Sequence, residues 1–225
     1  SKYDAFLAAN FHPTAPDERV VLIKRVRMWL FTPMGTYPLS QEYLSEFRRW
    51  PWPTWIYEYR LPEGALRIQE QVRLSPEEHV AWSILSWDAP VLSDVALILR
   101  PDVELRSHHR ETKAFLLNEA EFAGQYQKLN DKQGIGFQRQ VSDELWMVVH
   151  VNSGEFHSEP EWSYNIRHPH EASRGQESVC DAFSPGYFSI PLDTLKNSAA
   201  LVCAVVGPGQ AHHGFRSSFP GDGEF

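Results

Sequence analysis

The sequence is short of cysteine, of long apolar runs and of positive charge, and each shortage excludes a class of protein. Two cysteines, Cys180 and Cys203, have no CxxC spacing and are too few for a disulfide framework. We therefore expect free thiols and a cytoplasmic location. Lys and Arg number 21 against 29 Asp and Glu, which gives a net charge of −8 without a basic stripe, so nucleic acid is not an expected partner.

Apolar runs stay well below the roughly 18 residues that a membrane-spanning helix needs. The first residues, SKYDAFLAANF, also lack the charged and apolar regions of a signal peptide. We expect a soluble chain with no membrane partner.

Motifs for common cofactors and nucleophiles are missing as well. The sequence has no GxGxxG, GxxxxGK[ST] or GxSxG, and we expect no cofactor. Three histidine pairs suggest metal binding at first sight. A metal site, however, needs three or four convergent ligands, and adjacent residues of a strand point to opposite faces. No metal is therefore expected at His108-His109, His168-x-His170 or His212-His213.

Short runs with strand character fill most of the chain. Residues 66–74 alternate apolar and polar side chains, and only Glu70 breaks the apolar face. Residues 40–50 are the single fair helix candidate, with Ser40 as a possible cap. The other clear strand candidates are 20–30, 54–60, 80–87, 91–99, 145–151 and 199–206, and the weaker ones are 114–117, 122–129, 136–141, 154–157 and 187–190.

About a dozen strands are too many for one comfortable sheet, whereas two stacked sheets would bury their inner faces. With 225 residues, 42% of them hydrophobic, one sizeable core is expected. The predicted fold class is all-β, a large antiparallel two-sheet β-sandwich with few short helices. Residues 1–206 would form this domain, and the Gly/Pro-rich residues 207–225 would form a linker towards a missing domain.

Residues 162–188 combine aromatic, cationic and acidic side chains without a strand or helix period. Long loops in compact domains are usually functional or disordered, and the aromatics argue against disorder. We interpret this segment as a functional loop.

A second polar constellation is LRPDVELRSHH, residues 99–109. Strand alternation would place Asp102, Glu104, Arg106 and His108 on one face. That face is either an exposed edge with ordinary charge pairs or a surface that grips a hydroxyl-rich ligand.

Eight Trp and eight Tyr are numerous for a core of this size. Flat rings beside acidic and basic groups suit sugar binding, although aromatic residues of β-sandwiches are often core. The candidate stacking residues are Trp52, Trp55, Tyr57, Trp162 and Tyr164.

The order of these motifs resembles the N-terminal domain of prokaryotic glycogen debranching enzymes of the amylo-α-1,6-glucosidase family. The resemblance spans residues 2 to about 206 and rests on KYDAFLAANFHP, RVVLIKRVRMWL, WPTWIYEY, LRPDVELRSHH and W-x-Y ahead of HExxRGxExxxDxFxPGYF. It implies a β-supersandwich similar to that of galactose mutarotase, followed by an (α/α)6 barrel that carries the hydrolytic carboxylates. The family's Gly-rich start is missing here, so we expect a chain trimmed at both ends.

The resemblance also implies site residues and partners. The family's Arg-x-x-His element falls on Arg106 and His109, and its Glu-x-x-Arg-Gly element on Glu171, Arg174 and Gly175. The implied partners are an α-glucan oligosaccharide and the chain's own C-terminal catalytic domain, with this fragment non-catalytic. The full set of candidate substrate-binding or interdomain residues is Trp55, Arg106, His109, Trp162, Tyr164, Glu171, Arg174, Glu177 and Asp181.

Alternatives remain open at this point. A buried Arg174–Asp181 ion pair could simply shape the loop, and Gly175 and Gly186 could serve turns with positive φ. A mutarotase-type aldose epimerase would pair His109 or His170 as acid with Glu171 or Glu177 as base. A purely structural scaffold for the catalytic barrel is the third hypothesis.

Overall fold

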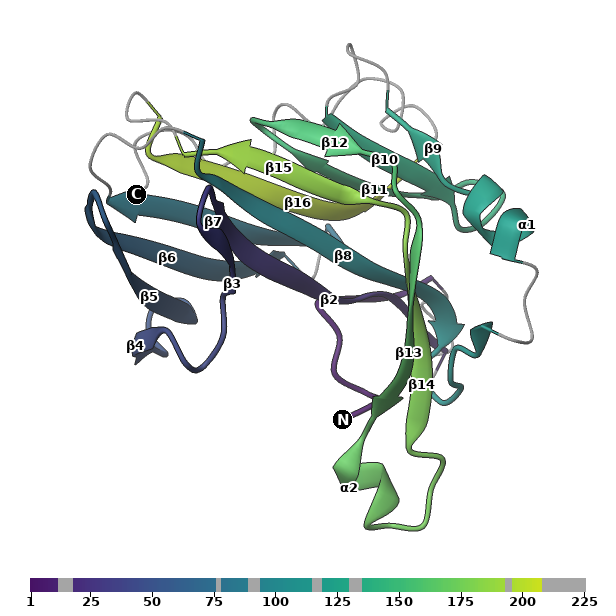
Figure 1. Cartoon of the computed structure of the whole chain (residues 1–225). Coiled ribbons are helices and arrows are strands. Elements are labelled where there is room, and N and C mark those ends of the chain that lie inside the picture. Colours follow the sequence, from purple (N-terminus) through teal and green to yellow (C-terminus); the bar gives the residue numbers. More distant parts are fainter. Residues whose placement is uncertain are drawn as a thin grey trace.

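The protein forms two antiparallel sheets of eight strands each (Figure 1), which confirms the predicted all-β sandwich. The structure is a computed structural model. It describes residues 1–11, 18–75, 78–88, 94–114, 119–129, 135–192 and 196–207. The predicted linker beyond Gly207 lies outside the described residues.

The first sheet is built around the long strands β2 (Arg19–Thr32) and β8 (Ala96–Ser107), which pair along most of their length. On one edge of β2 lie β1 (Leu7–Asn10) and β3 (Gly35–Pro38). The other edge of β8 pairs with two further strands. These and their partners are β12 (Glu155–His157), β13 (Glu161–Arg167), β14 (Val179–Ser184) and β15 (Tyr187–Pro191).

The second sheet has the order β4-β5-β6-β7-β16-β11-β10-β9. Its hairpins follow directly from the alternating runs in the sequence, each of which becomes one strand. The members are β4 (Leu44–Arg48), β5 (Thr54–Leu61), β6 (Gly64–Ser75), β7 (Val80–Asp88), β9 (Gln127–Lys128), β10 (Ile135–Gln140), β11 (Trp146–Val151) and β16 (Ser198–Val206).

The core lies between the inner faces of the two sheets. Leu66 and Ile68 of β6 are fully buried there, as the period of two predicts. Both cysteines are free and buried, which agrees with the predicted free thiols.

Two secondary-structure predictions are wrong. Residues 40–50 hold no helix: β4 pairs with β5 instead, and Phe47 packs on Trp55 with ring centroids 5.2 Å apart. A three-residue apolar face was too weak to outweigh sheet pairing. In the predicted strand 122–129, residues 122–124 belong to the helix α1 (Glu119–Gly124), and only the two-residue β9 is a strand. Of the predicted strand 114–117, only Ala114 is described.

The predicted functional loop 162–188 is also wrong as a loop. It contains most of β13, the short helix α2 (Pro169–Ala172), all of β14 and the start of β15. The strands β13 and β14 form a hairpin that extends away from the sandwich with α2 at its end (Figure 1). We call residues 161–184 the projecting hairpin. Its strand period was hidden because five of the seven residues of β13 are polar or charged.

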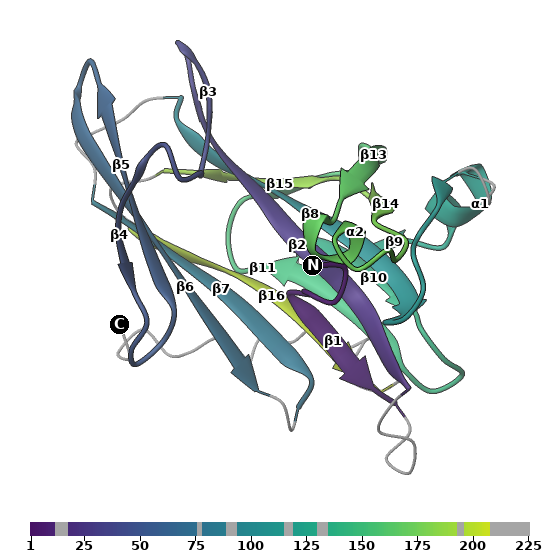
Figure 2. The same cartoon turned by 90° about the horizontal axis from the view of Figure 1, so that it is seen from below.

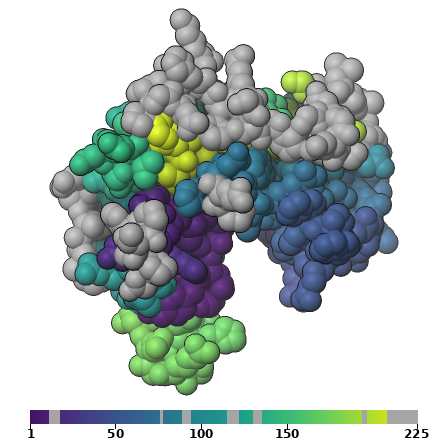
Figure 3. Space-filling view, turned by 180° about the vertical axis from the view of Figure 1, so that it is seen from behind, coloured from purple at the N-terminus to yellow at the C-terminus, as the bar shows by residue number. Residues whose placement is uncertain are grey.

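The sheets diverge at the opposite end of the molecule. From below, β4 and β5 lie well away from β1 and the projecting hairpin (Figure 2). The space-filling surface is hollowed between the part formed by β4 to β6 and the part formed by the N-terminal strands and the hairpin (Figure 3). The described chain therefore offers two regions of interest, the projecting hairpin and the space between the diverging sheets.

Candidate functional site

The N-terminal segment lies beside α2 of the projecting hairpin and is held by buried cations. Lys24 of β2 donates hydrogen bonds from Nζ to the backbone oxygens of Ser1 at 2.8 Å, Lys2 at 3.2 Å and Asp4 at 2.5 Å. The guanidinium of Arg106 donates a further bond to the Lys2 oxygen at 2.9 Å. Burial lowers the pKa of Lys24.

The polar face predicted on β8 is buried, so it is neither an exposed edge nor an open ligand surface. Asp102, Glu104 and Arg106 are 0%, 2% and 8% exposed. The Nε of Arg106 donates to Glu104 at 2.8 Å. Burial raises the pKa of Glu104, and the positive charges of Arg106 and Lys24 oppose this rise. These groups form an internal network that joins β2, β8 and the N-terminal segment.

Glu171 of the projecting hairpin also binds the N-terminal segment. It lies on α2, is 1% exposed, and accepts a hydrogen bond from the Ser1 hydroxyl at 2.6 Å. That hydrogen bond is the main reason why the pKa of Glu171 falls to about 2. Its other carboxylate oxygen is buried and has no hydrogen-bond partner among the described residues. The fixed carboxylate links the hairpin to the start of the chain.

Asp181 stabilises the hairpin through backbone hydrogen bonds and not through the ion pair with Arg174 considered above. Its two carboxylate oxygens accept backbone N–H bonds from Ala114 at 2.9 Å and from Asn165 at 2.8 Å. The register of β13 and β14 shifts at this point, and Asn165 has a φ of +57°. Arg174 is exposed, so the proposed buried Arg174–Asp181 pair is wrong.

The end of the hairpin is polar and open to solvent. Arg174 and Glu177 are exposed there, and Glu177 accepts a bond from Lys113 Nζ at 3.1 Å. This bond lowers the pKa of Glu177. Gly175 has a φ of +68°, as its predicted turn role requires. His109 is exposed, and its ring lies beside that of His108, with centroids 3.8 Å apart and planes tilted by 39°.

The aromatic candidates divide between core and surface. Trp162 packs against Phe122 and Phe183, with ring centroids 5.4 and 5.2 Å apart. Tyr164 is 57% exposed on the hairpin. Trp55 lies on β5, which is far from the hairpin in both ribbon views (Figures 1 and 2). The structure therefore brings Arg106 of β8 and Glu171 of α2 to the same N-terminal segment, whereas Asp181 binds backbone N–H groups of Ala114 and Asn165 and Trp55 lies elsewhere.

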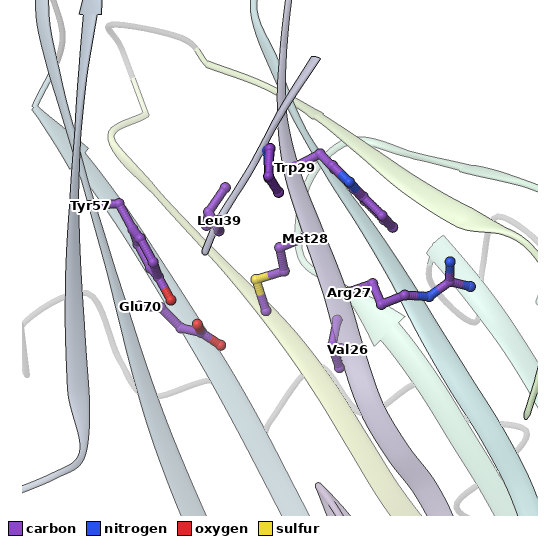
Figure 4. A pocket seen from close by; sticks show the side chains of 8 residues that line it. Val26, Arg27, Met28, Trp29, Leu39, Tyr57 and Glu70 are labelled. Carbon is purple, nitrogen blue, oxygen red and sulfur yellow. The ribbon is translucent and has the colours of Figure 1, made fainter. Parts of the chain in front are cut away.

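Glu70, which is not among the candidate residues predicted from the sequence, lies between the diverging sheets. Glu70 of β6 lines a cavity of about 280 Å³ together with Tyr57, Met28 and Leu39 (Figure 4). The sequence carried a signal for it, because Glu70 is the single interruption of the apolar face of residues 66–74. Burial raises the pKa of Glu70 to about 7.

Within the described residues, no three His, Cys, Asp or Glu side chains converge as a metal site would require. None of the helices described is long and apolar enough to cross a membrane.

Residues 1–198 match the family model described as glycogen debranching enzyme N terminal. The chain therefore belongs to the glycogen debranching enzyme N-terminal family. No curated protein matches it in sequence.

Solved structures with a similar arrangement include a bacterial glucoamylase complexed with acarbose. It has a TM-score of 0.50 and 11% sequence identity, and the match covers 87% of this chain and 28% of the glucoamylase chain. A polysaccharide lyase matches with a TM-score of 0.33 and 11% identity, over 83% of this chain and 25% of that one. The glucoamylase likeness shows the shared fold, and this chain spans less than a third of that protein.

Proposed function

We propose that this chain is the substrate-facing and interdomain module of a cytoplasmic glycogen debranching enzyme, and that it takes no direct part in bond cleavage. The parent enzyme would hydrolyse α-1,6-glucosidic branch points of glycogen or a related α-glucan on a separate (α/α)6 catalytic domain. The family membership supports the enzyme class. The observation that carries the modular role is the projecting hairpin, whose helix α2 is tied to the N-terminal segment by Glu171 and is followed by exposed polar side chains.

The hairpin is held at both ends. A two-stranded ribbon is only marginally stable in water. Here Phe183 and Trp162 join the base of the hairpin to the sandwich core, and the buried network of Lys24, Glu104, Arg106 and Glu171 ties α2, through the N-terminal segment, to β2 and β8. A rigid projection with free polar side chains at its end is suited to docking on a second domain.

The chemistry of Glu171 supports a non-catalytic role. Glycoside hydrolysis normally uses one carboxylic acid to protonate the leaving group and a second carboxylate as nucleophile or base. A buried carboxyl with a pKa of about 2 does not hold a proton at neutral pH. The same burial disfavours Glu171 as the base of a mutarotase-type epimerase, because a sugar could not reach it.

Kinetics of the enzyme that carries this chain with its catalytic domain test the proposal. Arg174→Ala removes an exposed donor at the hairpin end and is expected to raise KM for a branched α-glucan about tenfold, the loss of about 1.4 kcal/mol of binding. Glu171→Ala should have a larger effect on KM, because it releases α2 from the N-terminal segment. Arg60→Ala is the matched control, because Arg60 is exposed on β5, away from the hairpin.

Thermal denaturation of each variant separates loss of docking from loss of folding. The Arg174→Ala variant should unfold at the temperature of the unmodified chain, because its side chain is exposed. Unchanged KM and kcat in both hairpin variants would contradict the interdomain role.

A further inference from the structure

Glu70 occupies a position at which a strand normally buries an apolar side chain. It lies on the inner face of β6 in the same parity as Leu66 and Ile68, and its neighbours in register are Trp55 and Leu85. One of its oxygens accepts a hydrogen bond from the Ser83 hydroxyl at 3.0 Å. Within the described chain no basic side chain forms an ion pair with it. Burying a carboxyl group without a charged partner costs folding free energy, which makes Glu70 a candidate for a functional role.

The carboxyl group faces a cavity instead of packed side chains. The cavity measures about 280 Å³ and lies between β6 and β5 on one side and β2 on the other. Figure 4 shows the side chains of Glu70 and Tyr57 reaching into this space towards Met28. The side chains of Arg27 and Trp29 point away from it, so these residues contribute backbone to the wall (Figure 4).

An open strand edge adds backbone donors and acceptors to the same wall. β1 pairs with residues 19–23 of β2, and β3 pairs with residues 29–32. Between them, the carbonyl oxygen of Met28 accepts the N–H of Leu39 at 2.9 Å, which shows that Met28 directs its backbone groups to this edge. Val26, two residues earlier, directs its N–H and C=O to the same edge, where the described residues supply no pairing strand.

The cavity therefore combines polar and apolar surfaces in a definite arrangement. Glu70 and the Val26 backbone offer hydrogen-bonding groups, while Met28, Leu39 and the Tyr57 ring offer an apolar surface. Its size is at the small end of ligand pockets, which are typically about 300–1,000 Å³. A pyranose ring matches these surfaces, because it has hydroxyl groups around its edge and C–H groups on its faces.

We propose that this cavity binds one sugar ring, the terminal glucosyl residue of an α-glucan chain, through hydrogen bonds from its hydroxyl groups to Glu70 and to the backbone of Val26. The choice of glucose rests on the proposed function, whereas the existence of a sugar site rests on the cavity alone. The site lies apart from the projecting hairpin and needs no catalytic domain. It would hold a chain end of the polymer on the module.

The test is a titration of the 225-residue chain with maltotriose, followed by isothermal calorimetry and by tryptophan fluorescence. Trp55 is the register neighbour of Glu70, so occupation of the cavity should change the emission. Saturable binding is expected. Glu70→Leu keeps the side-chain bulk, removes both oxygens and should weaken binding at least tenfold. Val26→Phe fills the cavity and should abolish binding.

Glu58→Leu is the matched control, because Glu58 is exposed on the neighbouring strand β5. It should bind maltotriose like the unmodified chain. Thermal denaturation must show that each variant is folded. Failure of the unmodified chain to saturate, or equal affinity of the folded Glu70→Leu variant, would overturn the proposal.

The two proposals fail independently. Arg174→Ala should leave maltotriose binding by this chain unchanged while it impairs the whole enzyme. If the chain binds maltotriose but the hairpin variants leave KM and kcat unchanged, only the proposed interdomain role is rejected. If the hairpin variants change KM but the chain does not bind maltotriose, only the proposed sugar site is rejected.

Discussion

The guanidinium of Arg27 donates two hydrogen bonds to one carboxylate oxygen of Asp102, from Nε at 3.0 Å and from Nη2 at 2.9 Å. Asp102 is fully buried, and its other oxygen accepts a bond from Arg25 Nε at 2.6 Å. One buried carboxylate thus joins two arginines of β2 to β8. Breaking a buried pair is costly because it leaves a charge without its partner.

Asp102→Ala should lower the free energy of unfolding by about 2 kcal/mol, the usual loss for hydrogen bonds to a charged group, because Arg25 and Arg27 are 45% and 20% exposed and can be hydrated. Urea denaturation measures this loss. Glu161→Ala is the matched control, because Glu161 also contacts Arg27, at 3.1 Å, but is exposed. It should cost less than about 1 kcal/mol. Equal losses in the two variants would show that Asp102 contributes no more than a surface charge.

Glu70 should make the protein less stable as the pH rises. Its pKa is about 7 in the folded protein and near the ordinary glutamate value of about 4.5 in the unfolded chain. The folded state binds the proton more tightly, so the favourable contribution is complete below pH 4.5 and is lost as the pH rises through 7. The loss is up to about 3 kcal/mol, at 1.36 kcal/mol per unit.

Glu70→Leu should remove this loss, and its free energy of unfolding should exceed that of the unmodified chain most clearly above pH 7. Urea denaturation at a series of pH values between 4 and 8 measures the difference. A constant difference between the two proteins across this range would contradict a raised pKa.

His150 should have the opposite effect, on the acid side. It is 3% exposed, and burial lowers its pKa to about 4. The folded state therefore favours the neutral imidazole, and the stability present above pH 6.5 is lost as the pH falls through 4. His150→Leu should flatten the acid limb of the stability curve, whereas His170→Leu, at an exposed position of α2, should not. Identical acid limbs in all three proteins would contradict the prediction.

Gly186 permits a close approach between two strands. A Cβ at this position would collide with the backbone carbonyl oxygen of His157 on β12. Gly186→Ala should therefore destabilise the protein by more than about 2 kcal/mol, as overpacked backbone sites do. At Gly124, where a Cβ would meet nothing within 4 Å, the same substitution should cost little. Thermal denaturation compares the two, and similar melting temperatures would show that the strands can separate at no cost.

Much of the fold could be predicted because the alternation of apolar and polar side chains in a strand depends only on residues close together in the sequence. Residues 66–74 show which side chains of β6 face the core, and β6 has that arrangement in the structure. The prediction of a helix at 40–50 failed because a few apolar residues at helical spacing cannot outweigh pairing with β5. The projecting hairpin was missed because most side chains of β13 are polar or charged, so this strand has no apolar face that marks it in the sequence.

The candidate site was only partly predictable. Arg106, Glu171 and Asp181 could be singled out by motif, yet whether they were exposed or buried depended on residues more than 60 positions away. Glu70 was visible as an exception in an apolar pattern, but a pattern cannot show whether such a residue faces packed side chains or a cavity.

The sequence by itself determined that the chain is a two-sheet antiparallel sandwich, since apolar and polar side chains alternate along most of its strands, and its motif order determined the family. Only the tertiary structure decided what the charged residues do. Burial of Glu104, Arg106 and Glu171 arises from the docking of the N-terminal segment, and the cavity beside Glu70 arises from the separation between β2 and β6. Both depend on contacts between distant segments, which local periodicity does not encode.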